Sequence, residues 1–204
     1  MADSWAKLKR DCADCRGCEL CQTRQHLVFG VGREDAEVMF IGEGPGEQED
    51  LQGEPFVGPA GKLLDTMLEI IDIRRENVYI ANVVKCRPPR NRDPQPGEQA
   101  ACRPWLDRQM ALIRPKVVVC LGRIAAQAVI EPEFRITRRH GEVIERGGCF
   151  YIGTYHPSAL LRDPDKRPEA FEDLMVIRRW ISDFCHDTFN DKSKHSQGLE
   201  SIYD

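Results

Sequence analysis

The stretch EVMFIGEGPGEQED, residues 37–50, decides the fold of this chain. Its first six residues form an apolar run typical of a short buried strand, and a glycine-rich acidic loop follows at once. Three further runs have the same character: NVYIANVV at 77–84, KVVVCLG at 116–122 and CFYIGTY at 149–155. The sequence therefore predicts four short strands, each followed by a loop.

Helical patterns separate these strands. Apolar residues recur at helical spacing in 61–72, 97–113, 123–130 and 168–185, and Pro104 in the second pattern predicts a first turn, a break or a kink there. Alternation of strands and helices favours right-handed crossovers and a buried parallel sheet. We expect an α/β fold of three α/β/α layers around a central four-stranded, mainly parallel sheet, with functional groups at the carboxyl ends of the strands.

Length and composition place this fold in one domain. The chain has 204 residues, 41% of them hydrophobic, which suffices for a single core over residues 1–186. Residues 187–204 are polar and aperiodic, and we expect them to be disordered. No apolar run approaches the ~20 residues that span a bilayer, and residues 1–10 lack the apolar core of a secretory signal. These features predict a soluble intracellular protein.

Charge is unevenly distributed along the chain. The net charge of −4 argues against a protein that coats nucleic acid with its whole surface. Two segments are nevertheless rich in Lys and Arg, KCRPPRNR at 85–92 and RITRRH at 135–140. On charge alone, a solvated loop face and a phosphate-binding face are equally good interpretations of these segments.

The cysteines indicate metal or redox chemistry. The chain has nine, and four of them stand at three-residue intervals in CADCRGCELC, residues 12–21. Thiols stay reduced inside the cell, so close spacing there favours a metal or redox site over a disulfide framework. The odd number of cysteines agrees with this interpretation.

The loop over residues 42–62 combines glycines with carboxylates. Gly42, Gly44 and Gly46 would let the backbone approach a ligand closely, but the acidic residues beside them oppose a phosphate, and neither GxGxxG nor a P-loop pattern is present. Such a loop suits a substrate that becomes cationic as it reacts, as an oxocarbenium ion does when a glycosidic bond breaks. An ordinary turn is the alternative interpretation.

Polar residues also follow the second and fourth predicted strands. Asn82 offers both a donor and an acceptor, which reading the edge of a base requires, although its amide could instead bond its own backbone. His156 precedes a proline that holds the backbone extended, so the imidazole can project into a crevice; a structural histidine is the alternative. Leu161 and the leucine before it, beside Arg162, resemble apolar wedges that enter a base stack.

Five segments, taken in order, resemble those of the family 4 uracil-DNA glycosylases, an iron–sulfur-containing branch of bacteria and archaea. They are GEGPGEQED, PFVGPAGKLL, NVVKCRPPRNR, VVVCLG and HPSALLR, and the resemblance runs from about Cys15 to Phe184. One such segment could occur by chance, whereas five in register are specific. The resemblance implies the fold of that superfamily and an enzyme that flips uracil out of DNA and hydrolyses its N-glycosidic bond, which leaves an abasic site for base excision repair.

The resemblance also implies a 4Fe–4S cluster, which the family holds with a Cys-x2-Cys-x-Leu-x3-Arg segment and two later cysteines. The implied ligands are Cys15, Cys18, Cys86 and Cys102. Leu20 and Arg24 follow the first pair as the pattern requires, and the pattern fails if it starts three residues earlier or later. Cys12 and Cys21 remain as bystanders or as alternative ligands.

A uracil pocket is implied in the same way. The base would stack on Phe56 while Asn82 reads its edge. Backbone groups of Gly42, Gly44 and Gly46 would line the pocket.

Catalytic and DNA-contacting residues complete the implied site. Glu43 corresponds to the carboxylate that supports the oxocarbenium ion or positions the attacking water, and Glu49 is a second candidate. His156 would hydrogen-bond the uracil oxygen that gains negative charge, a contact worth roughly 3–4 kcal/mol per donor lost. Leu161, with Arg162, resembles the segment that enters the helix where the base was. The implied DNA-contacting residues are Lys62, Arg87, Arg90, Ser158, Leu161 and Arg162.

One position departs from the family. It commonly has Arg before the glycine of RRHGE, where this chain has His140, and whether Arg139 replaces it as a phosphate contact stays open. We expect uracil-containing DNA, single- or double-stranded, as the partner of a monomer that makes no membrane contact. Its expected location is cytoplasmic, at the nucleoid of a prokaryote.

Three other classes fit parts of the sequence: a covalent uracil-trapping DNA-binding relative, a non-enzymatic Fe–S or redox protein, and a structural zinc module. The trapping relatives carry a basic, His-bearing insertion after the second strand, whereas 15 residues and no His separate Cys86 from Cys102. A ferredoxin run ends in Cys-x3-Cys-Pro, which this chain lacks. Four thiolates would also suit zinc.

Overall fold

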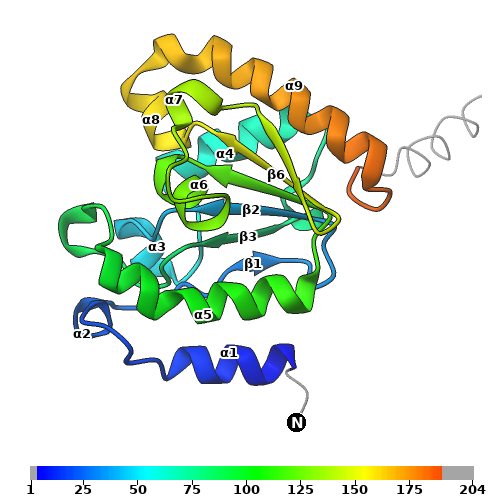
Figure 1. Cartoon of the computed structure of the whole chain (residues 1–204). Helices are drawn as coiled ribbons and strands as arrows, with labels where there is room; N and C mark the ends of the chain where they lie inside the picture. The colour runs from blue at the N-terminus through cyan, green and yellow to red at the C-terminus, as the bar shows by residue number, and fades with distance from the viewer. Residues whose placement is uncertain (1–3, 190–204) are drawn as a thin grey trace, which may run out of the picture.

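A six-stranded sheet with helices on both faces forms the body of the protein (Figure 1). The structure is a computed structural model that describes residues 4–189. The strands are β1 (Val31–Gly32), β2 (Val38–Gly42), β3 (Tyr79–Asn82), β4 (Val117–Leu121), β5 (Val143–Arg146) and β6 (Cys149–Thr154). Their order is β1-β3-β2-β4-β6-β5, with the central four parallel and the two edge strands antiparallel to their neighbours. The predicted α/β class is confirmed.

The four predicted strands are the four central strands, and the two edge strands were not predicted. Every residue of β2, β3 and β4 is buried, which explains their continuous apolar sequences. By contrast, β1 has two residues and β5 ends in two exposed ones, so neither carries a strong pattern. The sheet therefore has six strands where the sequence predicts four.

The helices and short 3-10 turns connect these strands. The helices are α1 (Trp5–Ala13), α2 (Leu20–Thr23), α3 (Glu47–Gln52), α4 (Pro59–Ile70), α5 (Pro96–Ile113), α6 (Arg123–Val129), α7 (Ile136–Arg139), α8 (Pro157–Arg162) and α9 (Arg167–Phe184). The 3-10 turns are Arg75–Asn77, Pro89–Asn91 and Pro164–Lys166. None of the helices between residues 4 and 189 has the length and apolar character needed to cross a lipid bilayer.

Two apolar cores lie on opposite faces of the sheet. Helices α4 and α9 cover one face, where Leu68 and Ile177 are buried against the strands. Helices α5 and α6 cover the other face through residues that include Leu106 and Ala125. Helix α1 lies along the outer side of α5 and encloses a small third cluster with Leu8 at its centre (Figure 1). The arrangement is three-layered, with α1 added outside.

Helix α5 differs from its prediction. It runs from Pro96 to Ile113 as one helix of 18 residues with Pro104 inside it. Pro104 stands well beyond the first turn, and the helix continues past it unbroken. Because proline has no N–H, one intrahelical hydrogen bond is missing there, and packing of α5 on the sheet and on α1 compensates for it.

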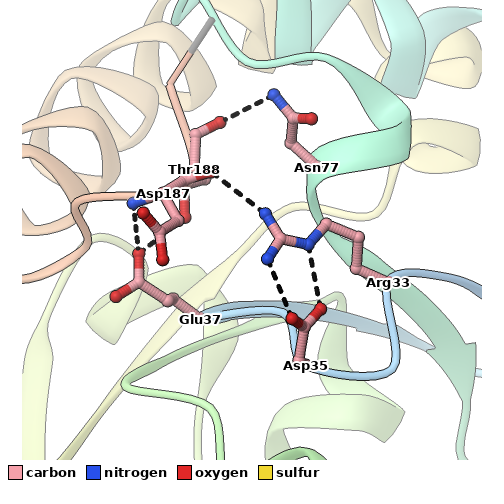
Figure 2. A network of polar contacts seen from close by, with 6 residues as sticks. All are labelled: Arg33, Asp35, Glu37, Asn77, Asp187 and Thr188. Carbon is pink, nitrogen blue, oxygen red and sulfur yellow. Dashed lines mark hydrogen bonds and ion pairs between the residues drawn. The ribbon is translucent and has the colours of Figure 1, made fainter. Parts of the chain in front are cut away.

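After α9 the chain is fastened to the end of the sheet opposite the carboxyl ends of the parallel strands (Figure 2). The backbone N–H of Asp187 donates to the Glu37 carboxylate (2.8 Å), and the amide of Asn77 donates to the carbonyl oxygen of Thr188 (3.1 Å). Arg33 donates to the Asp187 carbonyl (3.3 Å), and Thr188 is 1% exposed.

The first residues of the tail predicted at 187–204 are attached to the sheet. Residues 187 and 188 are held by these contacts, and Phe189 forms a β-bridge with Ile73. The remaining part of the predicted tail, 190–204, lies outside the described residues.

Replacing Glu37 by Ala should destabilise the protein by about 2 kcal/mol, because it removes charged hydrogen bonds to Asp187 and Lys116 from a side chain that is only 13% exposed. Thermal unfolding should show a fall in Tm of about 4–8 °C. Asp35→Ala is the control, since that carboxylate is 78% exposed in its ion pair with Arg33 and should change stability by less than about 0.5 kcal/mol. Equal effects of the two substitutions would contradict the account.

Candidate active site and cysteine pocket

A cavity of about 970 Å³ opens at the carboxyl ends of the parallel strands. Most of the predicted site residues line it: Glu43, Gly44, Gly46, Glu49, Phe56, Lys62, Asn82, His156, Ser158, Leu161 and Arg162. The cavity is large enough for a nucleotide-sized ligand rather than an ion. Register brings these loops together, since Gly42 at the end of β2 pairs with Asn82 at the end of β3, and Leu121 of β4 pairs with Thr154 of β6.

Asn82 presents an unsatisfied oxygen. It is 2% exposed, and Oδ1 is the one buried side-chain oxygen or nitrogen between residues 4 and 189 without a hydrogen-bond partner. A Cβ on Gly42 would lie 2.5 Å from this oxygen and 2.5 Å from Cζ of Phe56, so glycine is required there. Leaving a buried acceptor unpaired costs about 1–3 kcal/mol. The oxygen is therefore positioned to accept from a ligand.

Phe56 forms the apolar wall of the cavity. Its φ of 55° is left-handed, a conformation that few bulky residues adopt. Gly61 of α4 makes this fit, because a Cβ there would lie 1.9 Å from the Phe56 carbonyl oxygen. The ring faces that of His156 at a centroid distance of 5.6 Å and an interplanar angle of 29°. The strained backbone thus lies at an aromatic ring in the cavity wall.

His156 is held in one tautomer. Its Nδ1 accepts from the backbone N–H of Ser158 (3.1 Å) and lies 2.8 Å from that residue's hydroxyl. A neutral imidazole in this setting carries its proton on Nε2. Burial lowers the pKa of His156 to about 4, and the positive charge of Arg162 acts in the same direction. At neutral pH the side chain is therefore an uncharged donor through Nε2.

Glu43 titrates unusually for a glutamate. Burial raises its pKa to about 7, and the nearby carboxylate of Asp93 adds to the effect. The positive charges of Arg123 and Arg162 oppose this shift. Glu43 is thus a carboxylate in the cavity wall whose ionisation changes near neutral pH.

Glu49 is used differently. One of its oxygens accepts from the backbone N–H of Gly46 (3.1 Å), and the other accepts from those of Val57 (3.0 Å) and Gly58 (2.9 Å). Both oxygens are therefore engaged in holding the loop that frames the cavity. This geometry favours a positioning role for Glu49 over direct contact with a reacting atom.

The predicted DNA-contacting residues fall into two groups. Lys62, Ser158, Leu161 and Arg162 line the rim of the cavity, and Leu161 is 42% exposed although it is apolar. Arg87 and Arg90 lie outside that lining. Two consecutive residues of this basic turn, Arg90 and Asn91, have a left-handed φ of 56°, which fixes a sharp bend. Arg87 is tied to the same turn through Asn91 (2.8 Å).

Asp93 and Arg123 also line the cavity and were not singled out from the sequence. They form an ion pair of 2.5 Å and both act on the pKa of Glu43. Isolated charges give no sequence signal of their own. Arg123 could have been considered from its place directly after the third predicted strand.

The His140 departure has a structural account. Nδ1 of His140 hydrogen-bonds the buried carboxylate of Asp173 (2.8 Å), and the imidazole packs on Tyr155 at 4.9 Å. Arg139 forms ion pairs with Glu131 and Glu142. Both residues are therefore engaged within the protein.

A second pocket gathers five cysteines. Cys15, Cys18, Cys21, Cys86 and Cys102 line it. Cys12 lies outside, fully buried in the third apolar cluster. Within residues 4–189 no group of three or more His, Cys, Asp or Glu side chains is arranged to hold a metal ion.

Three of the four predicted cysteine ligands share one feature: their sulfurs accept an N–H. Trp105 donates to Cys15 (3.2 Å), Arg24 to Cys86 (3.2 Å) and the backbone of Lys85 to Cys102 (3.2 Å). Such donors stabilise thiolates, whereas burial acts in the opposite direction: it raises the pKa of Cys86, and it raises the pKa of Cys102 to about 11.

Known proteins resemble this chain over most of its length. A family model described as the uracil DNA glycosylase superfamily matches residues 29–176. A type-4 uracil-DNA glycosylase of Archaeoglobus fulgidus is 50% identical over 183 residues, which cover 86% of this chain and 92% of that protein. The type-4 enzyme of Thermotoga maritima is 49% identical over 171 residues, 82% of this chain and 89% of that one.

Glu43→Gln should be more stable than the wild type at pH 8, by about 2 kcal/mol, and equally stable near pH 4. The folded-state pKa of Glu43 is about 7, above its ordinary value of 4.5. Ionisation in the cavity therefore lowers the stability of the wild type as the pH rises from 4.5 through about 7, and glutamine removes this cost. Urea unfolding at both pH values tests this. Glu47→Gln, on a side chain that is 64% exposed, is the control. A stability difference that does not change with pH would contradict the prediction.

Proposed function

Because the chain belongs to the uracil-DNA glycosylase superfamily, and within it to the type-4 enzymes, we propose that it removes uracil from DNA by hydrolysing the N-glycosidic bond. The product is an abasic site for repair. The observation that carries the proposal is the unpaired Oδ1 of Asn82, buried beside Gly42 and Phe56 in the wall of the cavity that His156 also lines.

Base recognition follows from the amide of Asn82. A flipped uracil stacked on Phe56 would donate its N3–H to Oδ1 and accept from the amide NH2 with O4. Cytosine presents an acceptor and an amine at these positions, so both hydrogen bonds would fail. Cytosine would therefore leave the buried Asn82 amide unpaired, and the free-energy cost of this is the basis of discrimination against cytosine.

His156 acts on the leaving base. The neutral imidazole would donate its Nε2–H to the uracil oxygen on which negative charge develops as the bond breaks. Since the pKa of His156 lies well below neutrality, the group stabilises a uracil anion by hydrogen bonding and does not protonate it. The bond to Ser158 keeps the proton on the required nitrogen.

Glu43 acts on the sugar. Its ionised carboxylate would stabilise the oxocarbenium ion or position the attacking water on the side opposite the base. With a pKa of about 7, the active, ionised form increases as the pH rises through neutrality. Glu49 supports this group by fixing the loop, in keeping with its three backbone hydrogen bonds.

DNA would bind across the rim of the cavity. Leu161 would enter the helix in place of the flipped base, with Arg162, Lys62 and Ser158 at the flanking phosphates. Arg87 and Arg90 would contact the backbone farther from the base. We propose that the enzyme acts as a monomer on uracil in single- or double-stranded DNA.

We also propose that the cysteine pocket holds a 4Fe–4S cluster through Cys15, Cys18, Cys86 and Cys102. The convergence of the four cysteines on one pocket and the N–H donors to three of their sulfurs support this assignment. When bound, the cluster would crosslink the amino-terminal segment to the region after β3 and supply no chemistry to the hydrolysis. Cys21 borders the pocket and remains an alternative ligand.

His156→Ala should lower the rate of uracil release by about a hundredfold or more, because a donor to the developing anion is lost. Release is measured on DNA containing one uracil opposite guanine, opposite adenine, or in a single strand. Unchanged circular dichroism and iron content control for the fold. Wild-type turnover would remove His156 from the mechanism.

A heat-stable protein–DNA adduct from the wild type, in place of free uracil and an alkali-labile strand, would show a covalent trap instead.

Replacing each cysteine of the pocket region by Ser should divide them into two classes. Iron content and absorbance at about 400 nm should be lost for Cys15, Cys18, Cys86 and Cys102. The Cys12→Ser and Cys21→Ser variants should retain both signals. A colourless wild-type protein that holds one equivalent of zinc would contradict the cluster assignment.

A further inference from the structure

A buried lysine lies between the two pockets. Lys85 is 1% exposed, and its ammonium donates to the carbonyl oxygen of Asn82 (2.9 Å) and to Oε1 of Gln109 (2.6 Å). Gln109 is itself fully buried and donates to the Phe29 carbonyl (2.9 Å) and the Tyr79 hydroxyl (3.1 Å). Both partners of the ammonium are therefore neutral and fixed in the core.

Burial of this ammonium lowers the stability of the fold, so packing alone does not account for a lysine at this position. Among residues 4–189, the Lys85 ammonium hydrogen-bonds only these two uncharged oxygens. A buried cation that hydrogen-bonds no carboxylate is destabilising, and thiolates in the cysteine pocket that Lys85 also lines would offset part of this cost without bonding the ammonium. The charge therefore points to a task at the atoms that it binds.

One of those atoms belongs to the base-reading residue. The edge strand β1 pairs with β3 only at Tyr79 and Ile80, so the carbonyl of Asn82 lies beyond the end of that ladder. The Lys85 ammonium supplies the hydrogen bond that a neighbouring strand would otherwise give. Since Oδ1 of Asn82 has no hydrogen-bond partner of its own, the direction of the amide depends on the backbone that carries it and on packing beside Gly42 and Phe56.

The backbone of Lys85 faces the other pocket. Its N–H donates to Sγ of Cys102 (3.2 Å), and the next residue in the chain is Cys86. Between them and Asn82, the N–H groups of Val83 and Val84 donate to the carbonyls at the end of β2, at 2.9 and 3.1 Å. Residues 82–86 thus connect the cysteine pocket to the base pocket through a short segment whose backbone is hydrogen-bonded along its length.

We propose that Lys85 is a positioning residue for base recognition: its ammonium holds the end of β3 so that the Asn82 amide meets the edge of uracil, and its backbone ties that end to the cysteine pocket. The inference rests on the proposed base-reading role of Asn82. Lys85 itself lies behind the cavity wall and touches neither the base nor the sugar in this role.

A double-mutant cycle on uracil binding tests the proposal. Lys85→Met should raise the Kd for free uracil, measured by titration calorimetry, by about tenfold. If the lysine were merely structural, its replacement would leave this Kd unchanged. In an Asn82→Ala background, Lys85→Met should have no further effect, because the amide that it positions is gone. Lys9→Met, on the exposed outer face of α1, is the matched control, and all proteins are compared at equal iron content.

Two results would overturn the inference while leaving the proposed function intact. One is a Kd for uracil in Lys85→Met equal to that of the wild type. The other is a double variant in which the fold-changes in Kd of Lys85→Met and Asn82→Ala multiply. Unchanged uracil binding by Asn82→Ala alone would refute the base-reading role and, with it, this inference. If Lys85→Met does not fold, Gln109→Met removes one acceptor of the ammonium and should weaken uracil binding by about threefold, again only when Asn82 is present. Wild-type binding by that variant would count against the inference equally.

Discussion

The register between β2 and β3 is the constraint on which the site depends. Gly42 stands opposite Asn82, and the pairing continues beyond the strands as the next two backbone N–H groups donate to the carbonyls of Gly42 and Glu43. The carboxylate on one strand end and the amide on the other therefore cannot move independently. A slip of one residue would turn the Asn82 side chain to the opposite face of the sheet and remove it from the cavity.

The same end of the sheet collects groups that destabilise the fold. Asn82 has an unsatisfied buried oxygen, Phe56 has a left-handed backbone, and burial raises the pKa of Glu43 and lowers that of His156. Each is unfavourable for stability, and in the proposed reaction each would interact with the base, the sugar cation or the developing anion. The satisfied polar network at the other end of the sheet, seen in Figure 2, shows that the chain forms complete networks where no ligand is expected.

The central strands, and the gathering of most predicted site residues around one cavity, could be predicted because both have strong local signals in the sequence. Residues buried on two sides give unbroken apolar runs, and the loops after them carry motifs in a fixed order. The edge strands had no such signal, because β1 is too short and β5 is half exposed. The different use of two carboxylates six residues apart could not be predicted, since it depends on where the N–H groups of Val57 and Gly58 lie in space. Asp93 and Arg123 are single charges brought together only by the fold.

Two series of hydrogen bonds connect the cysteine pocket with elements that line the cavity, so the amino-terminal segment belongs to the same structural unit as the loops at the carboxyl ends of the strands. One connection runs from Cys102 through Lys85 to the end of β3. The other runs from the segment after Arg24, where backbone N–H groups of residues 25 and 26 donate to the buried carboxylate of Asp50 on α3, the helix that also carries Glu49. A rigid group that ties these segments together would therefore fix both the Asn82 amide and the helix that carries Glu49. Such a role depends on crosslinking alone and requires no change of oxidation state.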